Sequence, residues 1–213
     1  MDLKHLPNLI TLARLVLAVV TFWWLEDTLR HPPDDPHFIR ACFWSFWFYL
    51  VAGFSDFLDG YLARRYGWTS ALGRIADPVV DKVMTLGAMV YLAASQGLEI
   101  EGDVGRVMPA WAVVLLLARE FLVTALRGLV ESRGMAFPAE RIGKNKMIAQ
   151  TAYLLILLGA AGQIPERLGL GFLGYLRNPW LVESLFWVVV GLTLWSGVDY
   201  AFRARRMLRG VAL

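Results

Sequence analysis

The sequence predicts an all-α integral membrane protein with six transmembrane helices. Hydrophobic residues make up 57% of the 213-residue chain, and the mean hydropathy of +0.51 lies outside the usual range of soluble domains. These residues gather in six long runs, which short polar or proline-containing segments separate. A single membrane domain covering 1–213 is the simplest organisation at this length.

The first span is expected at about 9–25, after a short segment at 2–6 that we expect to lie at the membrane interface. Asn8 is suited to capping this helix, and its side chain could instead contact a substrate. Thr11 is a further candidate for a substrate contact. Arg14 lies more than one turn inside the apolar run, where it either snorkels to the interface or contacts the same substrate.

The second span is rich in aromatic residues, and the third carries Pro78 early in its helix, where we expect a missing N–H to cost little. The basic segment 143–146 introduces the fifth span, and four arginines follow the sixth. A proline-rich loop separates the first two spans. We expect the later spans at about 38–64, 72–95, 107–129, from 143–146 to 162, and 180–202.

The basic residues predict the orientation. With six spans, both termini lie on one side, and that side receives 15 of the 21 Lys and Arg residues. The positive-inside rule makes this side cytoplasmic, so we expect a cell-membrane protein in which both termini and the connection between the second and third spans face the cytoplasm. Because the basic residues lie at helix ends, they favour anionic lipids or substrates as partners and do not indicate nucleic-acid binding.

Four aspartates mark the junction of the second and third spans. Asp56 and Asp59 are spaced i,i+3, and Asp77 and Asp81 are spaced i,i+4, so each pair shares one helix face. Converging carboxylates repel one another unless a cation holds them or some are protonated. Oxygen ligands alone suit Mg²⁺ or Mn²⁺, and four aspartates are enough for two ions. A polar turn with solvated acids is the alternative, which the flanking apolar runs disfavour.

This stretch resembles the signature of the CDP-alcohol phosphotransferase family, Asp-x2-Asp-Gly-x2-Ala-Arg-x8-Gly-x3-Asp-x3-Asp. All eight fixed positions are filled, by Asp56, Asp59, Gly60, Ala63, Arg64, Gly73, Asp77 and Asp81. The resemblance implies that an alcohol displaces CMP from a CDP-linked donor, that the four aspartates hold two metal ions, and that Asp81 is the catalytic base. It also implies a homodimer. The residues it implies at the CDP site are Asp59, Gly60, Ala63, Arg64 and Gly73.

A basic cluster in the fourth and fifth spans bears on the acceptor. Arg119 is costly inside an apolar helix unless it is paired or used, and Arg127 falls eight residues later on nearly the same face. With Lys144 and Lys146 these arginines could bind a phosphate dianion, and a positive-inside belt is the alternative. Glu120 follows Arg119 directly and points about 100° away from it, so it is not expected to be an ideal partner.

Three further stretches resemble phosphatidylglycerophosphate synthases within this family, at 7–14, 118–127 and 143–150. They imply that the chain transfers a phosphatidyl group from CDP-diacylglycerol to sn-glycerol 3-phosphate. Gly128 departs from that subgroup, in which an acidic residue is common. Phosphatidylglycerol, giving cardiolipin, and inositol phosphate are alternative acceptors. A divalent-cation transporter is the rival from another class, which Arg64 and Arg74 disfavour because they lie beside the acids.

Overall fold

The computed structural model describes residues 6–66, 71–95, 108–137 and 141–209, with side chains at 10–55, 79–95, 108–137 and 142–209 except 172. The described residues form helices and turns and contain no strand, which confirms the all-α prediction. Short elements are η2 (Asp27–Leu29), α6 (Ile164–Arg167) and η3 (Gly171–Arg177). The long helices are α1 (Leu6–Glu26), α2 (Pro36–Tyr66), α3 (Ala71–Ala94), α4 (Ala110–Glu131), α5 (Arg141–Ala161) and α7 (Pro179–Arg209).

Each long helix corresponds to one of the six predicted spans. Within the described residues, two helical segments are long and apolar enough to cross a membrane, Pro36–Ser55 and Pro179–Arg209. The apolar run of α4 is interrupted by Arg119, Glu120 and Arg127, which belong to the site described below. The helices are therefore as expected, and the crossing of a membrane by all six stays a prediction.

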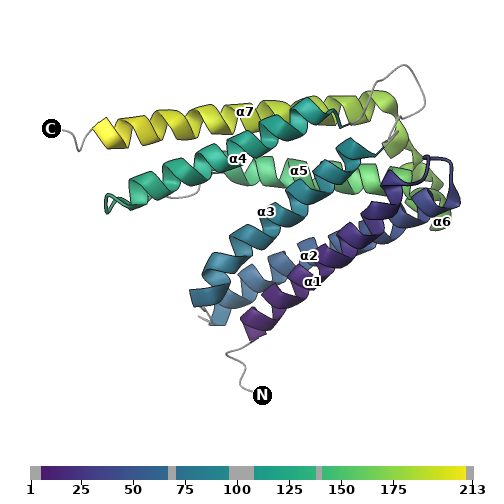
Figure 1. Cartoon of the computed structure of the whole chain (residues 1–213), viewed down its shortest axis with the longest axis horizontal. Helices are drawn as coiled ribbons and strands as arrows, with labels where there is room; N and C mark the ends of the chain where they lie inside the picture. The colour runs from purple at the N-terminus through teal and green to yellow at the C-terminus, as the bar shows by residue number, and fades with distance from the viewer. Residues whose placement is uncertain (1–5, 67–70, 96–107, 138–140, 210–213) are drawn as a thin grey trace.

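The long helices form two groups that meet near α6 and diverge toward the chain termini (Figure 1). In the first group, α1 packs against both α2 and α3. In the second group, α7 packs against both α4 and α5. Contacts of α3 with α4 and α5, and of α2 with α5, join the groups. This arrangement brings the middle of α3 next to the helices that carry the predicted acceptor residues.

Apolar side chains from both groups form one core, which includes Met89 of α3, Leu116 of α4 and Leu157 of α5. A second, smaller cluster surrounds Tyr200 of α7 and includes Val130 and Phe137. The helices also approach closely where α5 ends. A Cβ atom on Gly162 would lie 2.7 Å from the backbone nitrogen of Phe43 in α2, so only glycine fits this crossing without a backbone shift.

The proline-rich loop ends in a helix cap. Asp35 precedes α2, and its carboxylate accepts the backbone N–H of His37 at 2.7 Å. This hydrogen bond lowers the pKa of Asp35 below its ordinary value. The loop thus fixes the start of α2 with a side-chain cap of the kind that asparagine and aspartate favour.

Candidate active site

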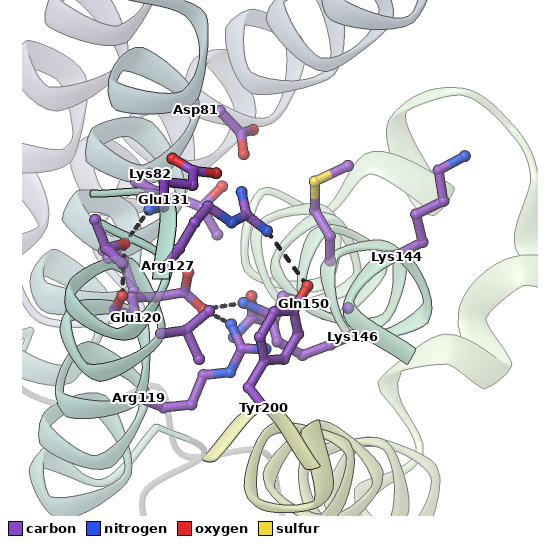
Figure 2. Close-up of a pocket in the computed structure, with 16 residues that line it drawn as sticks. Asp81, Lys82, Arg119, Glu120, Arg127, Glu131, Lys144, Lys146, Gln150 and Tyr200 are labelled. Atoms are coloured by element: carbon purple, nitrogen blue, oxygen red, sulfur yellow. Dashed lines mark hydrogen bonds and ion pairs between the residues drawn. The ribbon is translucent and has the colours of Figure 1, made fainter. Parts of the chain in front are cut away.

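A cavity of about 610 Å³ lies between α3, α4, α5 and α7 (Figure 2). Its lining combines apolar side chains with an unusually large number of charged ones. Five cationic and three anionic side chains line it, so its formal charge favours an anionic ligand. The charged residues are Asp81, Lys82, Arg119, Glu120, Arg127, Glu131, Lys144 and Lys146.

The structure brings Asp81 and the four predicted acceptor residues to this one cavity. Arg119 and Arg127 lie two helical turns apart on α4, and Lys146 comes from the first turns of α5. Lys144 also borders the cavity, but Figure 2 shows its side chain extending away from the other charged groups. The predicted cluster is therefore real in space, and its members are not equivalent.

Glu120 joins two of the predicted cations. Its Oε1 accepts a hydrogen bond from Nη1 of Arg119, with 2.8 Å between the two atoms. The same oxygen forms an ion pair with the Lys146 ammonium. Arg119 also donates through Nε to the Ser196 hydroxyl of α7, at 3.1 Å. Arg119 and Glu120 are each 9% exposed and Lys146 is 5% exposed, so this network is nearly closed to solvent.

The pairing of Arg119 with Glu120 differs from the expectation that adjacent residues point too far apart. The long arginine side chain turns along the helix and reaches the neighbouring carboxylate. Burial explains why it does so: water cannot solvate either group well here, and an unpaired buried charge costs several kcal/mol, roughly. The alternative that Arg119 belongs to a buried ion pair is confirmed.

Tyr200 of α7 holds the two arginines from the opposite side of the cavity. Its hydroxyl accepts a hydrogen bond from Arg127 Nη2 at 3.3 Å. The guanidinium carbons of Arg119 and Arg127 lie 5.6 and 6.0 Å from its ring centre, within cation–π range. Phe137 packs edge-on against the same ring at 5.4 Å and limits its movement.

Arg127 is the arginine of this cavity that lies outside the ion pairs of Glu120. Its hydrogen bond to Tyr200 engages one nitrogen, and its Nε is buried without a partner among the described residues. Arg119 and Lys146, by contrast, share the carboxylate of Glu120. An incoming anion can therefore bind Arg127 without first breaking an ion pair.

The mouth of the cavity is bridged between α3 and α4 beside Asp81. The Lys82 ammonium donates a hydrogen bond to the Thr124 hydroxyl at 2.7 Å. That hydroxyl donates a hydrogen bond to the backbone oxygen of Glu120 at 2.8 Å. This chain of hydrogen bonds ties the helix of the predicted base to the helix of the predicted phosphate ligands. It fixes their spacing without engaging Arg127.

The remaining predicted ligands lie on helices whose side chains here are outside the described set. Asp56 and Asp59 lie ten and seven residues before the end of α2, and Asp77 and Asp81 lie six and ten residues after the start of α3. At about 1.5 Å per residue, the two pairs lie at similar distances from the connection between these helices. This register fits a shared metal site, which stays a prediction.

The described side chains contain no group of three or more His, Cys, Asp or Glu that could hold a metal ion, and of the four predicted ligands they include Asp81 alone. Predictions for the side chains of Asn8, Asp56, Asp59, Gly60, Ala63, Arg64, Gly73 and Asp77 lie outside the described set.

Two predicted substrate contacts on α1 are described. Thr11 is 5% exposed and Arg14 is 2% exposed, and neither is among the residues that line the cavity. The burial of Arg14 is inconsistent with snorkelling to the membrane interface, because a snorkelling side chain keeps its charged end in water. Arg14 is instead enclosed by protein.

Glu120, Gln150 and Tyr200 are among the polar residues of the cavity that sequence reasoning missed as members of the site. Glu120 carried a usable signal, because an acid within an apolar helix needs a cation. Gln150 follows Lys146 by one helical turn and could have been placed on the same face. Tyr200 carried no such signal, since it lies 73 residues from Arg127.

Comparisons with known proteins identify the family to which this chain belongs. Residues 4–195 match the sequence model of a family described as CDP-alcohol phosphatidyltransferase. The CMP-forming cardiolipin synthase of Streptomyces coelicolor is 31% identical over 209 residues, which cover 96% of this chain and 84% of the relative. A probable phosphatidylglycerophosphate synthase of Mycobacterium tuberculosis is 31% identical over 210 residues, covering 98% and 86%.

A third relative, the CDP-diacylglycerol–glycerol-3-phosphate 3-phosphatidyltransferase of Bacillus subtilis, is 29% identical over 199 residues, which cover 92% of this chain and 93% of the relative. These matches define the class of the protein as a transferase of phospholipid biosynthesis. The chain belongs to the CDP-alcohol phosphatidyltransferase family, which confirms the resemblance seen in the sequence. It is an enzyme, and the transporter alternative is wrong.

Proposed function

We propose that this enzyme transfers the phosphatidyl group of CDP-diacylglycerol to sn-glycerol 3-phosphate, forming phosphatidylglycerophosphate and CMP. The cationic cavity beside Asp81 is the observation that carries this proposal. A phosphate monoester carries a charge of about −1.5 to −2 at neutral pH, which matches a lining with two more cations than anions. The relatives named for this activity in Bacillus subtilis and Mycobacterium tuberculosis support it.

Arg127 is the proposed main ligand of the acceptor phosphate. Its Nε, which has no partner among the described residues, and its planar guanidinium suit a phosphate oxygen, and the Tyr200 hydroxyl accepts a hydrogen bond from its Nη2. Arg119 and Lys146 also line the cavity, and their shared ion pair with Glu120 partly neutralises their charge. Lys144 is exposed at the edge of the cavity, where its charge attracts the anion from solution.

Asp81 is the proposed general base, because its carboxylate lines the cavity that would hold the acceptor. It takes the proton of the attacking hydroxyl as that oxygen forms a bond to the phosphorus that carries diacylglycerol. The bond from this phosphorus to the bridging oxygen of the diphosphate breaks. CMP leaves with that oxygen and with the electron pair of the broken bond.

The donor would bind beside this cavity at the aspartates of α2 and α3. Asp56, Asp59, Asp77 and Asp81 would hold two Mg²⁺ or Mn²⁺ ions, which when bound neutralise the diphosphate and stabilise charge on the leaving group. Oxygen-only ligands and the matching register of the two helices support this assignment. Gly60, Ala63, Arg64 and Gly73 of the same helices would contact the CDP group.

The membrane placement belongs to the same proposal. Large apolar side chains such as Trp23, Phe121 and Trp195 are more than two-thirds exposed, which suits a surface that faces lipid. All six long helices would span the bilayer, with both termini and the cavity on the cytoplasmic side. Acyl chains would then stay in the bilayer while glycerol 3-phosphate and CMP exchange with the cytoplasm. The family resemblance adds the proposal of a homodimer.

A second acceptor is favoured by one specific observation. The relative from Streptomyces coelicolor is named as a cardiolipin synthase, and its identity to this chain equals that of the Mycobacterium tuberculosis relative. Phosphatidylglycerol is therefore the alternative acceptor, and inositol phosphate is a further one. Phosphatidylglycerol presents a phosphodiester with a single negative charge. This charge neutralises less of the cationic excess in the cavity lining than the charge of a phosphate monoester does.

CMP release by purified enzyme tests these alternatives directly. The enzyme is supplied with CDP-diacylglycerol and Mg²⁺, and glycerol 3-phosphate, phosphatidylglycerol, inositol phosphate and serine are offered separately. We expect release with glycerol 3-phosphate and little with the others. Release with phosphatidylglycerol alone would overturn the acceptor assignment and leave the role of the aspartates intact.

A further inference from the structure

Gln150 carries a buried donor that has no partner among the described residues. Its side chain lines the cavity, the residue is 2% exposed, and the amide Nε2 has no hydrogen-bond partner among the described residues. A buried amide that lacks a partner costs about 1–3 kcal/mol. Burial without compensation is expected at a position where a ligand supplies the missing oxygen.

The position of Gln150 separates it from the groups that bind charge. It lies one helical turn beyond Lys146 on the same face of α5, farther from the start of that helix. The cations that would meet a phosphate lie on α4 and in the first turns of α5. A neutral amide next to this charged set is better suited to an uncharged hydroxyl than to the anion itself.

The chemistry of a three-carbon acceptor supplies one such hydroxyl. This step rests on the proposed function, in which Arg127 binds the phosphate and Asp81 faces the attacking hydroxyl. Glycerol 3-phosphate then has one oxygen function left, the secondary hydroxyl at its central carbon. Within the described cavity, the Gln150 amide is a buried donor that neither of these two roles uses.

We propose that Gln150 is a specificity-determining residue that donates a hydrogen bond to the non-reacting hydroxyl of the acceptor. A polyol phosphate with a hydroxyl next to the attacking one satisfies the amide, and an acceptor without it leaves the amide buried and unsatisfied. The enzyme therefore discriminates against the deoxy acceptor by the penalty of that unsatisfied group.

The test compares two acceptors that differ only at this hydroxyl. Glycerol 3-phosphate and 3-hydroxypropyl phosphate share the phosphate and the attacking hydroxyl, and the second lacks the secondary hydroxyl. We expect the wild-type enzyme to prefer glycerol 3-phosphate by about tenfold in kcat/KM for CMP release, the effect of one hydrogen bond. In Gln150→Met, which has a similar length and no donor, the preference should fall to about onefold to twofold.

Thermal unfolding of the ligand-free protein distinguishes this role from a structural one. Gln150→Met removes an unsatisfied buried amide, so its Tm should rise or stay unchanged. Thr193→Val is the matched control: Thr193 is fully buried in α7, its hydroxyl also lacks a partner among described residues, and it is not among the residues lining the cavity. This variant should keep the wild-type preference between the two acceptors.

Four results would overturn the proposal. Equal use of the two acceptors by the wild type would show that the enzyme does not recognise the secondary hydroxyl. An unchanged preference in Gln150→Met would assign the reading to another residue, and loss of folded protein in that variant would assign the amide a structural role. CMP release by the wild type with phosphatidylglycerol but with neither small acceptor would contradict the acceptor assignment itself and this inference with it.

Discussion

The cationic side chains of the cavity differ in their partners and in their exposure to solvent. Arg127 keeps a nitrogen available, whereas Arg119 and Lys146 are bound to Glu120, and Lys144 lies at the solvent edge. A protein that needs one strong anion ligand beside a buried ion-pair network gains from such a division. Cations without counterions would repel one another and resist burial, and Glu120 removes that cost for two of them.

Asp81 is expected to be essential for chemistry. Asp81→Asn should lower kcat for CMP release by at least about 100-fold, because the amide cannot take a proton from the attacking hydroxyl. CDP-diacylglycerol binding, measured by displacement of a labelled CDP lipid, should largely survive. Asp34→Asn, an exposed change in the loop before α2, serves as the control. Near-normal turnover by Asp81→Asn would remove it as the base.

Arg127 is expected to act mainly on acceptor binding. Arg127→Lys keeps the charge but loses the guanidinium fork, so the KM for glycerol 3-phosphate should rise about tenfold or more while the KM for CDP-diacylglycerol changes little. Lys144→Gln, at the exposed edge, should have a smaller effect that disappears at high salt. Steady-state kinetics with each substrate varied in turn measure both. An unchanged acceptor KM in Arg127→Lys would support the positive-inside belt.

Glu120 is expected to contribute to stability more than an ordinary acid does. Glu120→Gln leaves Arg119 and Lys146 buried without their shared counterion, which should destabilise the fold by roughly 3 kcal/mol or more. Glu166→Gln removes an exposed ion pair with Arg177 and should cost less than about 1 kcal/mol. Thermal unfolding in one detergent compares the two variants, and equal Tm values would contradict the buried role.

At the scale of helices, the site depends on how closely α2, α3, α4, α5 and α7 pack. The cavity takes its lining from four of them, and α5 is held against α2 at the Gly162 crossing. A shift of α5 would carry Lys146 and Gln150 away from Glu120 and from the cavity. Packing far from the charged residues thus controls their geometry.

Gly162 is expected to tolerate no side chain. Gly162→Ala places a Cβ against the backbone of Phe43, so helix α5 must move, at a cost of roughly 1–3 kcal/mol. Gly128→Ala in α4 is the matched control, because no atom lies within 4 Å of the added Cβ and alanine favours the helix. Thermal unfolding should therefore show a lower Tm for the first variant and an equal or higher Tm for the second. A Tm at the wild-type value in Gly162→Ala would show that the crossing is loose.

At the scale of the whole molecule, the expected topology places the cavity on the cytoplasmic side. Arg133 follows α4 near the cavity, and Asp34 precedes α2 on the side that the topology makes external. The one cysteine, Cys42, is buried, and Cys42→Ser gives a background without thiols. Single cysteines introduced at the two loop positions then report which side each occupies.

Labelling with a membrane-impermeant maleimide checks this topology. In the Cys42→Ser background, Asp34→Cys should react in right-side-out vesicles, and Arg133→Cys should react only in inverted or permeabilised ones. The reverse pattern would invert the orientation, and labelling of both positions from one side would contradict the three membrane crossings expected between them. CMP release should be retained by both variants, which confirms that the labelled protein is folded.

The sequence by itself determined the helices, the family and the chemical character of the site. Apolar runs and their polar boundaries depend on local composition, and the spacing of Asp56, Asp59, Asp77 and Asp81 depends on helix periodicity, so both are readable from residues close in the chain. The cationic residues were also identifiable, since charges inside apolar helices are costly without a role. These inferences needed no knowledge of how the helices pack.

Only the tertiary structure decided which charged residue meets which partner. The choice of Glu120 as the shared counterion of Arg119 and Lys146, and the contacts of Tyr200 with both arginines, depend on the packing of α4, α5 and α7. That the Gln150 Nε2 has no partner within the described part of the chain is likewise a property of the assembled cavity. Long polar side chains can reach in many directions, and burial selects one of them by removing water as the competing partner.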